Sequence, residues 1–474
     1  MLKNNGWWYV LLICVFATPT FAQTGTVADL NPDSTVRVGK IYVTGNNKTK
    51  LEIILRELDF QEGEVLKLAD FAEKVTLDQQ KLTNTRLFVM VEIVPLFMSE
   101  KEVDVLIRLQ ERWYIFPLPI FKLADRNFTE WWVNQNRDFS RVNYGAQLIH
   151  TNLTGRNDRF RFRAQFGFAK QMSLSYQIPY INRDQTIGLG FSTSYTTNKT
   201  VGVNSIAHRA QFVESDNVIR RAFSTSGTIT IRPSFYTRHS LNVGYVRSSV
   251  GDTIRDVNPE YHLRNESVQN YVRLSYTFSL DKRDYIAYPL TGSLLTVQLN
   301  QFGLGSFNDF NMFTTRLTYA KFFNINDKFY FANRIDAYNN SAQNIPYFVR
   351  SGFGYRPDFI RGYERFVIES NRYISNRTAL RFKVLEGVQE LSRRSLINQF
   401  RTLPYAFYLK IFMDAGYAGN PIDSTRNNFF NNEWIGSIGL GVDIVTYYDF
   451  VFRLEYSINR EGTTGLFFNF KSAL

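Results

Sequence analysis

Residues 159–168 read Arg159-Phe160-Arg161-Phe162-Arg163-Ala164-Gln165-Phe166-Gly167-Phe168. In an extended chain successive side chains point to opposite faces, so three arginines and Gln165 share one face, while four phenylalanines and Ala164 share the other. Residues 450–459 repeat this pattern, with five apolar side chains on one face. Both segments therefore predict a strand with one apolar face and one polar, water-exposed face.

Such alternation also occurs in soluble β-sandwiches, so the number of segments decides the fold class. About sixteen segments alternate in this way, beginning near Tyr144, Arg159, Met172, Ile187, Ile206, Ala222, Leu241, Tyr271, Ser293, Phe310, Phe329, Thr378, Phe407, Trp434, Phe450 and Gly465. An even number of antiparallel strands of about 10 residues, with an aromatic-rich apolar face and a polar interior, is typical of an outer-membrane barrel. We therefore expect an all-β transmembrane barrel of 16 strands over residues 141–474.

The composition agrees with a folded, strand-rich chain. Of 474 residues, 44% are hydrophobic and 21% are charged, which excludes a disordered chain and a coiled coil. The 42 Phe and 27 Tyr favour strands or an aromatic-rich membrane surface over a helical bundle.

Residues 1–22 have the organisation of a secretory signal peptide. Lys3 gives a positive start, residues 7–16 an apolar core, and Thr20-Phe21-Ala22 a small-x-small cleavage site. A membrane anchor is the alternative, but the run is short for a spanning helix, and no later segment reaches about 20 apolar residues. The bulky Leu12-Ile13 before Cys14 disfavours lipidation. Cleavage would change the net charge from +12 to +11 and leave no Cys, which excludes disulfides and thiolate sites.

After a short tail at residues 23–35, residues 36–112 predict a small α+β module. The expected order is strand (36–43), helix (48–58), helix (68–84), strand (88–96) and strand (103–109), with Gly45-Asn46 as a turn pair. The module resembles a POTRA domain, the polypeptide-transport-associated module of outer-membrane assembly factors. The residues that carry this resemblance are Ile41-Tyr42-Val43-Thr44-Gly45-Asn46, Thr49 and Thr85-Arg86-Leu87-Phe88.

We expect one such module, lying in the periplasm. An exposed sheet edge can accept an incoming extended chain by strand addition, which makes the module a candidate client-docking surface. The alternative is that it is a spacer or a scaffold for a partner subunit.

Residues 113–140, with Pro117 and Pro119, are interpreted as a linker at the barrel entrance; the alternative is a strand, which would shift the strand count. With the module in the periplasm, the long connections at residues 248–268, 340–376 and 417–433 face outward. Residues 386–404 are the exception, because this long connection is expected to be periplasmic.

The longest outward loop contains Phe359-Ile360-Arg361-Gly362-Tyr363-Glu364. Residues Ile360, Arg361, Gly362 and Tyr363 resemble the VRGY/F loop motif of the BamA/TamA outer-membrane assembly superfamily, or bacterial surface antigen family. On residues 408–415, Phe412 and Asp414 share the inward face and resemble the F-x-D strand motif of that family. The resemblance implies that Arg361 pairs with Asp414 and clamps the loop in the lumen, with Asp443 as a second candidate acid. The alternative for Arg361 is an ordinary solvated loop arginine.

A third match is a turn. Asp281-Lys282-Arg283-Asp284, followed by Pro289 and Gly292, resembles the D-x-R-D turn before the ninth strand of the family, and its expected role is structural. The Gly-rich stretch usual after the loop motif is replaced here by Ile368-Glu369-Ser370-Asn371.

The seam of the barrel would join the first strand, near residues 144–152, to the last, residues 466–474. Its candidate residues are Tyr144 and Gly145 on one side and Leu466, Phe468 and Phe470 on the other. The Phe-rich end is either an ordinary insertion signal or one edge of a working gate at which client strands are templated, and we predict the gate.

We find no pattern that indicates catalysis, a metal site or a cofactor. The four His are scattered, and no nucleophile elbow or phosphate loop occurs. Arginines alternate with apolar residues along strands, which indicates a charged lumen and not a nucleic-acid surface.

The resemblance implies an assembly factor that inserts other barrels. Its expected partners are outer-membrane lipid, unfolded outer-membrane protein clients, and periplasmic or lipoprotein subunits. The alternatives are an accessory barrel of a larger complex and, third, a two-partner-type secretion pore.

Overall fold

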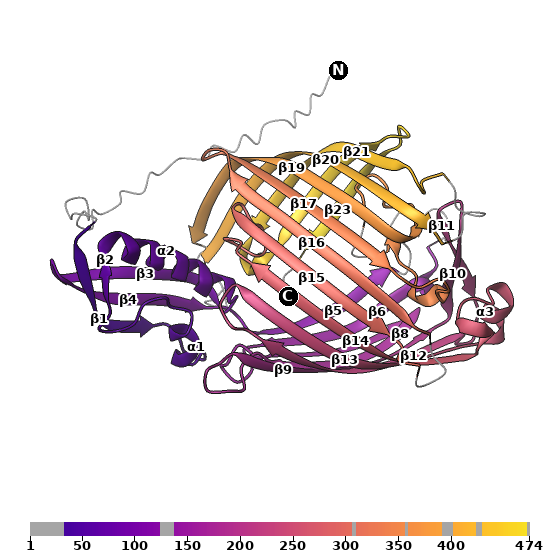
Figure 1. The fold of residues 1–474 in the computed structure, drawn as a ribbon, viewed down its shortest axis with the longest axis horizontal. Helices are drawn as coiled ribbons and strands as arrows, with labels where there is room; N and C mark the ends of the chain where they lie inside the picture. The colour runs from indigo at the N-terminus through magenta and orange to yellow at the C-terminus, as the bar shows by residue number, and fades with distance from the viewer. Residues whose placement is uncertain are drawn as a thin grey trace, which may run out of the picture.

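The computed structural model describes residues 33–123, 137–305, 310–355, 359–390, 402–422 and 429–471, and the signal peptide expected at residues 1–22 lies outside them. A small mixed domain stands at one end of a large barrel, as Figure 1 shows. Within the described ranges, no helix has both the length and the apolar character needed to cross a membrane.

The small domain has the POTRA arrangement. Its elements are β1 (Thr35–Thr44), α1 (Leu51–Leu55), β2 (Val65–Lys67), α2 (Leu68–Asn84), β3 (Phe88–Ser99) and β4 (Glu102–Glu111). The sheet order is β2-β1-β4-β3, with β1 and β4 parallel. Phe71 and Leu82 of α2 are buried against Val38 and Val105 of the sheet, so the apolar stripe of α2 covers one sheet face. The short strand β2 was not expected from the sequence.

The barrel wall of the described chain consists of sixteen long antiparallel strands, and the two-residue β18 (Gly352–Phe353) adds to β19. The sixteen are β5 (Ile115–Leu123), β6 (Val142–Thr151), β7 (Arg159–Gly167), β8 (Ala169–Ile178), β9 (Ile187–Asn198), β12 (Arg220–Ile231), β13 (Thr237–Val250), β14 (Val268–Asp281), β15 (Gly292–Phe302), β16 (Met312–Asn324), β17 (Phe329–Asn340), β19 (Ile368–Glu390), β20 (Thr402–Pro421), β21 (Trp434–Thr446), β22 (Val451–Asn459) and β23 (Thr464–Lys471). Closure of the barrel makes β23 and β5 neighbours.

Two sequence-based assignments were wrong. One missed a wall strand and the other added one, so the expected total of sixteen wall strands is unchanged. The segment at residues 113–140 is not merely a linker, because β5 pairs with β6 over nine residues and is the first strand of the barrel wall. The segment near Ile206 belongs to a hairpin of β10 (Thr200–Ile206) and β11 (Arg209–Glu214), which forms a separate sheet. That hairpin alternates because Val201 and Val203 are buried against Ile254 and neighbouring loop residues.

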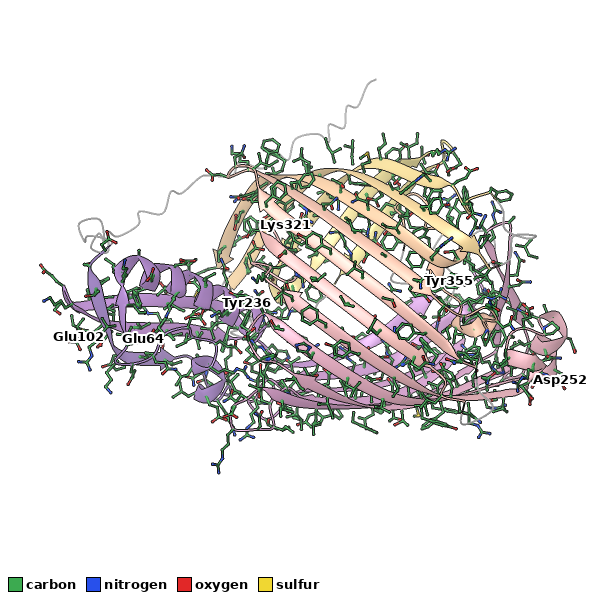
Figure 2. The ribbon with its side chains drawn as sticks, in the orientation of Figure 1. Glu64, Glu102, Tyr236, Asp252, Lys321 and Tyr355 are labelled. Atoms are coloured by element: carbon green, nitrogen blue, oxygen red, sulfur yellow. The ribbon has the colours of Figure 1, made fainter. Side chains whose placement is uncertain are left out.

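The outer surface of the barrel is apolar, as the alternation predicted. Phe162 and Phe166 of β7 and Ile438 and Leu440 of β21 are all exposed on the outside. Figure 2 shows side chains projecting outward along the wall, among them the labelled Lys321 near the end that faces the POTRA domain. This apolar belt is the membrane-facing surface.

The end of the barrel away from the POTRA domain is covered by loops. There α3 (Asp252–Val257) and the β10–β11 hairpin lie side by side (Figure 1), and Ile254 shares a buried cluster with Val203 and Tyr347. At the other end, β19 and β20 extend as a long hairpin, with Glu390 opposite Thr402. The two ends of the connection expected at residues 386–404, namely residues 386–390 and 402–404, are therefore strand, and residues 391–401 lie outside the described ranges.

Candidate functional site

The loop between β17 and β19 returns into the barrel. Ile360 is fully buried and clusters with Phe353 and Ile435. The wall residue beneath it is Gly416, where a Cβ would lie 2.9 Å from the Ile360 side chain. A glycine on β20 therefore makes room for the loop.

Arg361 and Asp414 lie together, in the arrangement that the family resemblance implied. The Arg361 Nε donates to Asp414 Oδ2 at 2.8 Å, Nη2 donates to Oδ1, and the Arg361 backbone N–H donates to Oδ2 at 3.2 Å. The guanidinium also sits 3.8 Å from the centroid of the Phe412 ring. Arg361 is only 9% exposed and Asp414 1%, so this is a buried bidentate pair and not a solvated arginine.

A second acid at Arg361 was missed by the sequence analysis. Arg361 Nη1 donates to Glu455 Oε1 at 3.0 Å, and Lys410 Nζ donates to the same oxygen at 2.9 Å. Asp443, the second acid considered, instead accepts from Lys410 at 2.7 Å and Arg453 at 3.0 Å. The six charged side chains form an alternating chain of three cations and three anions, in the order Asp414, Arg361, Glu455, Lys410, Asp443 and Arg453. We call it the lumen network.

Two glycines of β21 let the lumen network form. Gly441 lies opposite Lys410 on one side and Glu455 on the other, and a Cβ there would lie 2.7 Å from Lys410 Cε. A Cβ at Gly439 would lie 2.4 Å from the Phe412 ring. Side chains of β20 and β22 therefore meet over β21, which brings together residues that are not adjacent strand partners.

The remaining loop-motif residues hold the loop on the same wall. Gly362 has φ +84°, and a Cβ there would approach Ser437 to 3.2 Å, so glycine suits both the backbone and the space. Tyr363 is buried and donates from its hydroxyl to Glu461 at 2.6 Å. Asn459 donates to the Gly362 carbonyl at 3.0 Å.

The turn motif folds toward the lumen from the POTRA side. Asp281 accepts from Arg283 at 2.7 and 2.6 Å, and Asp284 caps the turn by accepting from the Leu290 N–H at 3.1 Å. Gly292 has φ +95° where a Cβ would strike the Lys282 carbonyl.

Two residues of this turn reach the far wall. The hydroxyl of Tyr288 donates to Asp443 at 2.9 Å, and the Pro289 carbonyl accepts from Arg381 at 2.7 Å. The lumen network therefore connects the outer loop to a periplasmic turn.

The POTRA-motif residues face the barrel or the POTRA core. Gly45 has φ +87° and lies against the Leu109 carbonyl, and Asn46 donates to the Thr49 carbonyl at 3.3 Å. Thr49 Oγ1 accepts from Asn152, in the turn after β6, at 2.9 Å. Leu87 and Phe88 are buried in the POTRA core.

Buried ion pairs fix the POTRA domain to the barrel rim. Arg112 contacts Asp449, in the turn between β21 and β22, at 2.9 and 3.1 Å, and Arg232 contacts Glu57 at 2.8 and 2.9 Å. Burial by itself would raise the pKa of Asp449, but the Arg112 guanidinium holds that pKa below its usual value. Figure 2 places Tyr236, in a neighbouring turn, at this junction.

The seam differs from the expected one. Tyr144 and Gly145 lie in β6, the second strand, so the strand that closes the barrel against β23 is β5. On β23, Leu466 and Phe468 are each 67% exposed on the outer face. The backbone of Phe470 lies in β23, while its side chain is outside the described part of the structure.

Comparison with known proteins agrees with this architecture. A family model described as the Omp85 superfamily domain matches residues 152–471, and a POTRA model, described as the surface antigen variable number repeat, matches residues 36–112. No protein with a curated description matches the sequence.

Two solved structures share the fold. BamA from Haemophilus ducreyi lacking POTRA domains 1–3 aligns with a TM-score of 0.51 at 16% identity, over 92% of this chain and 83% of that one. CdiB from Escherichia coli aligns with a TM-score of 0.51 at 11% identity, over 92% and 74%.

Omp85 proteins are non-enzymatic outer-membrane barrels whose POTRA domains lie in the periplasm, and they work with outer-membrane protein clients and partner subunits. The matched barrel segment covers more than half of the chain. The chain therefore belongs to the Omp85 superfamily, as an outer-membrane barrel with a periplasmic POTRA domain at residues 36–112.

Proposed function

We propose that this protein assists the folding and insertion of other outer-membrane β-barrel proteins. In this proposal the POTRA domain docks extended client segments, and the barrel templates strands at the seam between β5 and β23. The observation that carries it is the lumen network, which ties the outer loop and the periplasmic turn to one wall of the barrel.

The lumen network favours a lateral route over transport through the lumen. Transport through the lumen that displaced Arg361 from Asp414 or Tyr288 from Asp443 would expose buried charges at a cost of several kcal/mol each. A client strand added at the seam leaves these contacts intact. Strand addition also keeps backbone groups of the client paired, as the hydrocarbon of the membrane requires.

The POTRA sheet offers an edge for docking. Strand β3 is an outer strand of twelve residues, with Met90 and Met98 exposed on it. The opposite outer strand, β2, has three residues. An extended client segment would therefore find its longer template at β3.

The experiment is depletion of the protein followed by quantitative comparison of the outer-membrane proteome. A broad or client-specific loss of other barrels, restored by the wild-type chain and not by Arg361→Ala, would support an assembly role. An unchanged barrel set would refute it and favour an accessory or secretion role.

A further inference from the structure

The outer face of the barrel carries a cluster of cations at the end away from the POTRA domain. Arg221 lies at that end of β12, because the other end of the strand leads directly to Arg232, which pairs with Glu57 of the POTRA domain at 2.8 Å. Lys170 of β8 and Arg247 of β13 lie at the same end of the wall, and all three side chains are exposed. We call Lys170, Arg221 and Arg247 the rim cations.

The strand register brings the rim cations close together. Lys170 and Arg221 are both opposite Thr197 of β9, so two strand spacings, or about 10 Å, separate their backbones. Arg247 is opposite Phe223, two residues along β12 from Arg221, which makes that diagonal separation about 7–8 Å. Arg221 and Phe223 share the outward face of β12, so the cluster points away from the lumen.

The rim cations form no ion pair within the part of the chain that the structure describes. Seven wall strands, β5 to β9, β12 and β13, contain no Asp or Glu. In the neighbouring outer loops Glu214 pairs with Arg141, and Asp252 pairs with Arg255. Like charges this close repel one another, and an anion placed among them relieves the repulsion.

An apolar surface begins directly below the rim cations. Met172 and Phe223 are the next outward residues after Lys170 and Arg221, and Tyr195 of β9 is opposite both of them. The three apolar side chains are 53%, 37% and 46% exposed in that order. A ligand with an anionic head and an apolar body would match this order of charge and apolar surface along the membrane normal.

Further along the same strands the outward face is hollowed by a groove of about 420 Å³. It is lined among others by Tyr176, Phe191, Gly227, Ile229 and Leu241, from β8, β9, β12 and β13. Gly227 creates the hollow, because a Cβ at this position would have no atom within 4 Å. The groove is apolar and opens toward the membrane, so an acyl chain is the occupant that its surroundings supply.

The position of the groove relates it to the rim cations. Gly227 lies six residues from Arg221, or about 20 Å along β12. Strands of such barrels tilt by about 35–45°, so the groove lies about 15 Å below Arg221 along the membrane normal and about 13 Å to one side. Since the hydrocarbon layer is about 30 Å thick, the groove lies near the middle of the membrane, where acyl chains of the outer leaflet end.

We propose that the outer wall formed by β8, β9, β12 and β13 binds a phosphorylated glycolipid of the outer leaflet, with its phosphates on the rim cations and one acyl chain in the groove. The spread of the cations suits a lipid with more than one phosphate. The sideways offset of the groove suits a broad lipid with several acyl chains. This inference is independent of the proposed assembly role, so each can fail without the other.

The first test measures binding of diphosphorylated lipid A to residues 23–474 in detergent micelles by native mass spectrometry. Each cation near an anionic lipid contributes about fivefold in affinity, so Arg221→Gln should bind about fivefold less tightly and the triple variant Lys170→Gln/Arg221→Gln/Arg247→Gln about a hundredfold less tightly. Circular dichroism checks that each variant keeps its β-structure.

The matched control is Lys321→Gln, which removes an exposed, outward-facing cation of β16 near the POTRA end, as Figure 2 shows. It should leave the affinity for lipid A unchanged. An equal loss in Lys321→Gln and Arg221→Gln, or an unchanged affinity in the triple variant, would overturn the assignment of the phosphates to the rim cations.

Two further lipids identify the ligand. Diphosphorylated lipid A should bind about tenfold or more tightly than lipid A without phosphates and than phosphatidylglycerol, which has one phosphate and two acyl chains. Equal binding of the form without phosphates would overturn the headgroup contact, and equal binding of phosphatidylglycerol would overturn the choice of a glycolipid.

A last variant tests the groove. Gly227→Leu fills the hollow and should lower the affinity for lipid A by about threefold, through the loss of several dispersion contacts with the acyl chain. An affinity equal to that of the wild type would overturn the placement of an acyl chain in the groove.

Discussion

Removal of the Arg361 guanidinium should destabilise the barrel by about 3–5 kcal/mol, the cost of breaking a buried ion pair. Arg361→Ala leaves Asp414, 1% exposed, and Glu455, 2% exposed, with Lys410 as the nearest remaining cation of the network. It also removes the cation stacked on Phe412. Arg361→Lys should lose less, because it keeps a charge but not the bidentate geometry.

The assay is urea unfolding in lipid vesicles, followed by circular dichroism, for Arg361→Ala, Asp414→Ala and the double variant. Because both single changes break the same pair, the loss in the double variant should fall short of the sum by about 0.5–3 kcal/mol. The matched control is Arg460→Ala, which removes an exposed partner of Glu433 and should cost less than about 1 kcal/mol. Full additivity, or a loss at Arg361 no larger than that at Arg460, would refute the reasoning.

Three further changes follow from the described contacts. Gly439→Ala should lower the free energy of unfolding by about 1–3 kcal/mol through overpacking, since a Cβ there would lie 2.3 Å from a backbone carbonyl. Gly227→Ala is the control and should be neutral, because a Cβ at Gly227 has no atom within 4 Å. The midpoints of urea unfolding compare the two variants. Arg112→Ala leaves Asp449 buried without its bidentate partner, so limited proteolysis should cut between the POTRA domain and the barrel faster than in the wild type. Burial raises the pKa of Asp78 in the POTRA domain to about 6 despite its ion pair, so its contribution to stability is full below about pH 4 and is lost as the pH rises through 6. Asp78→Asn should flatten POTRA stability between pH 4 and 7, measured by urea unfolding, and an unchanged slope would contradict the shift.

Strand β5 shows where sequence reasoning failed. Two prolines argue against a strand that bonds to both neighbours, and by that rule residues 113–140 were assigned to a linker. The structure resolves the conflict. Thr151 N–H donates to the Tyr114 carbonyl in the β5–β6 register, so the even-numbered residues of β5 bond to β6, and the odd-numbered prolines leave these bonds intact. The side that a proline affects depends on register, which the local sequence does not contain.

Glu455 shows a second limit. Its inward direction followed from alternation along residues 450–459, as did that of Asp414 on residues 408–415. Its contact with Arg361 depends on two glycines of the intervening strand, which let side chains of β20 and β22 meet across β21.

The sequence by itself determined the local and periodic features of this protein. The period of two, sustained over some sixteen segments, predicted a barrel with an apolar outside. Short motifs that resemble those of a known family indicated the POTRA domain, and the same resemblance implied that the loop arginine pairs with Asp414. Only the tertiary structure decided which strand begins the wall, which strands meet at the seam and which charges share the lumen. The physical reason is that alternation gives the face of a side chain, whereas closure and contact depend on pairing between residues up to several hundred positions apart.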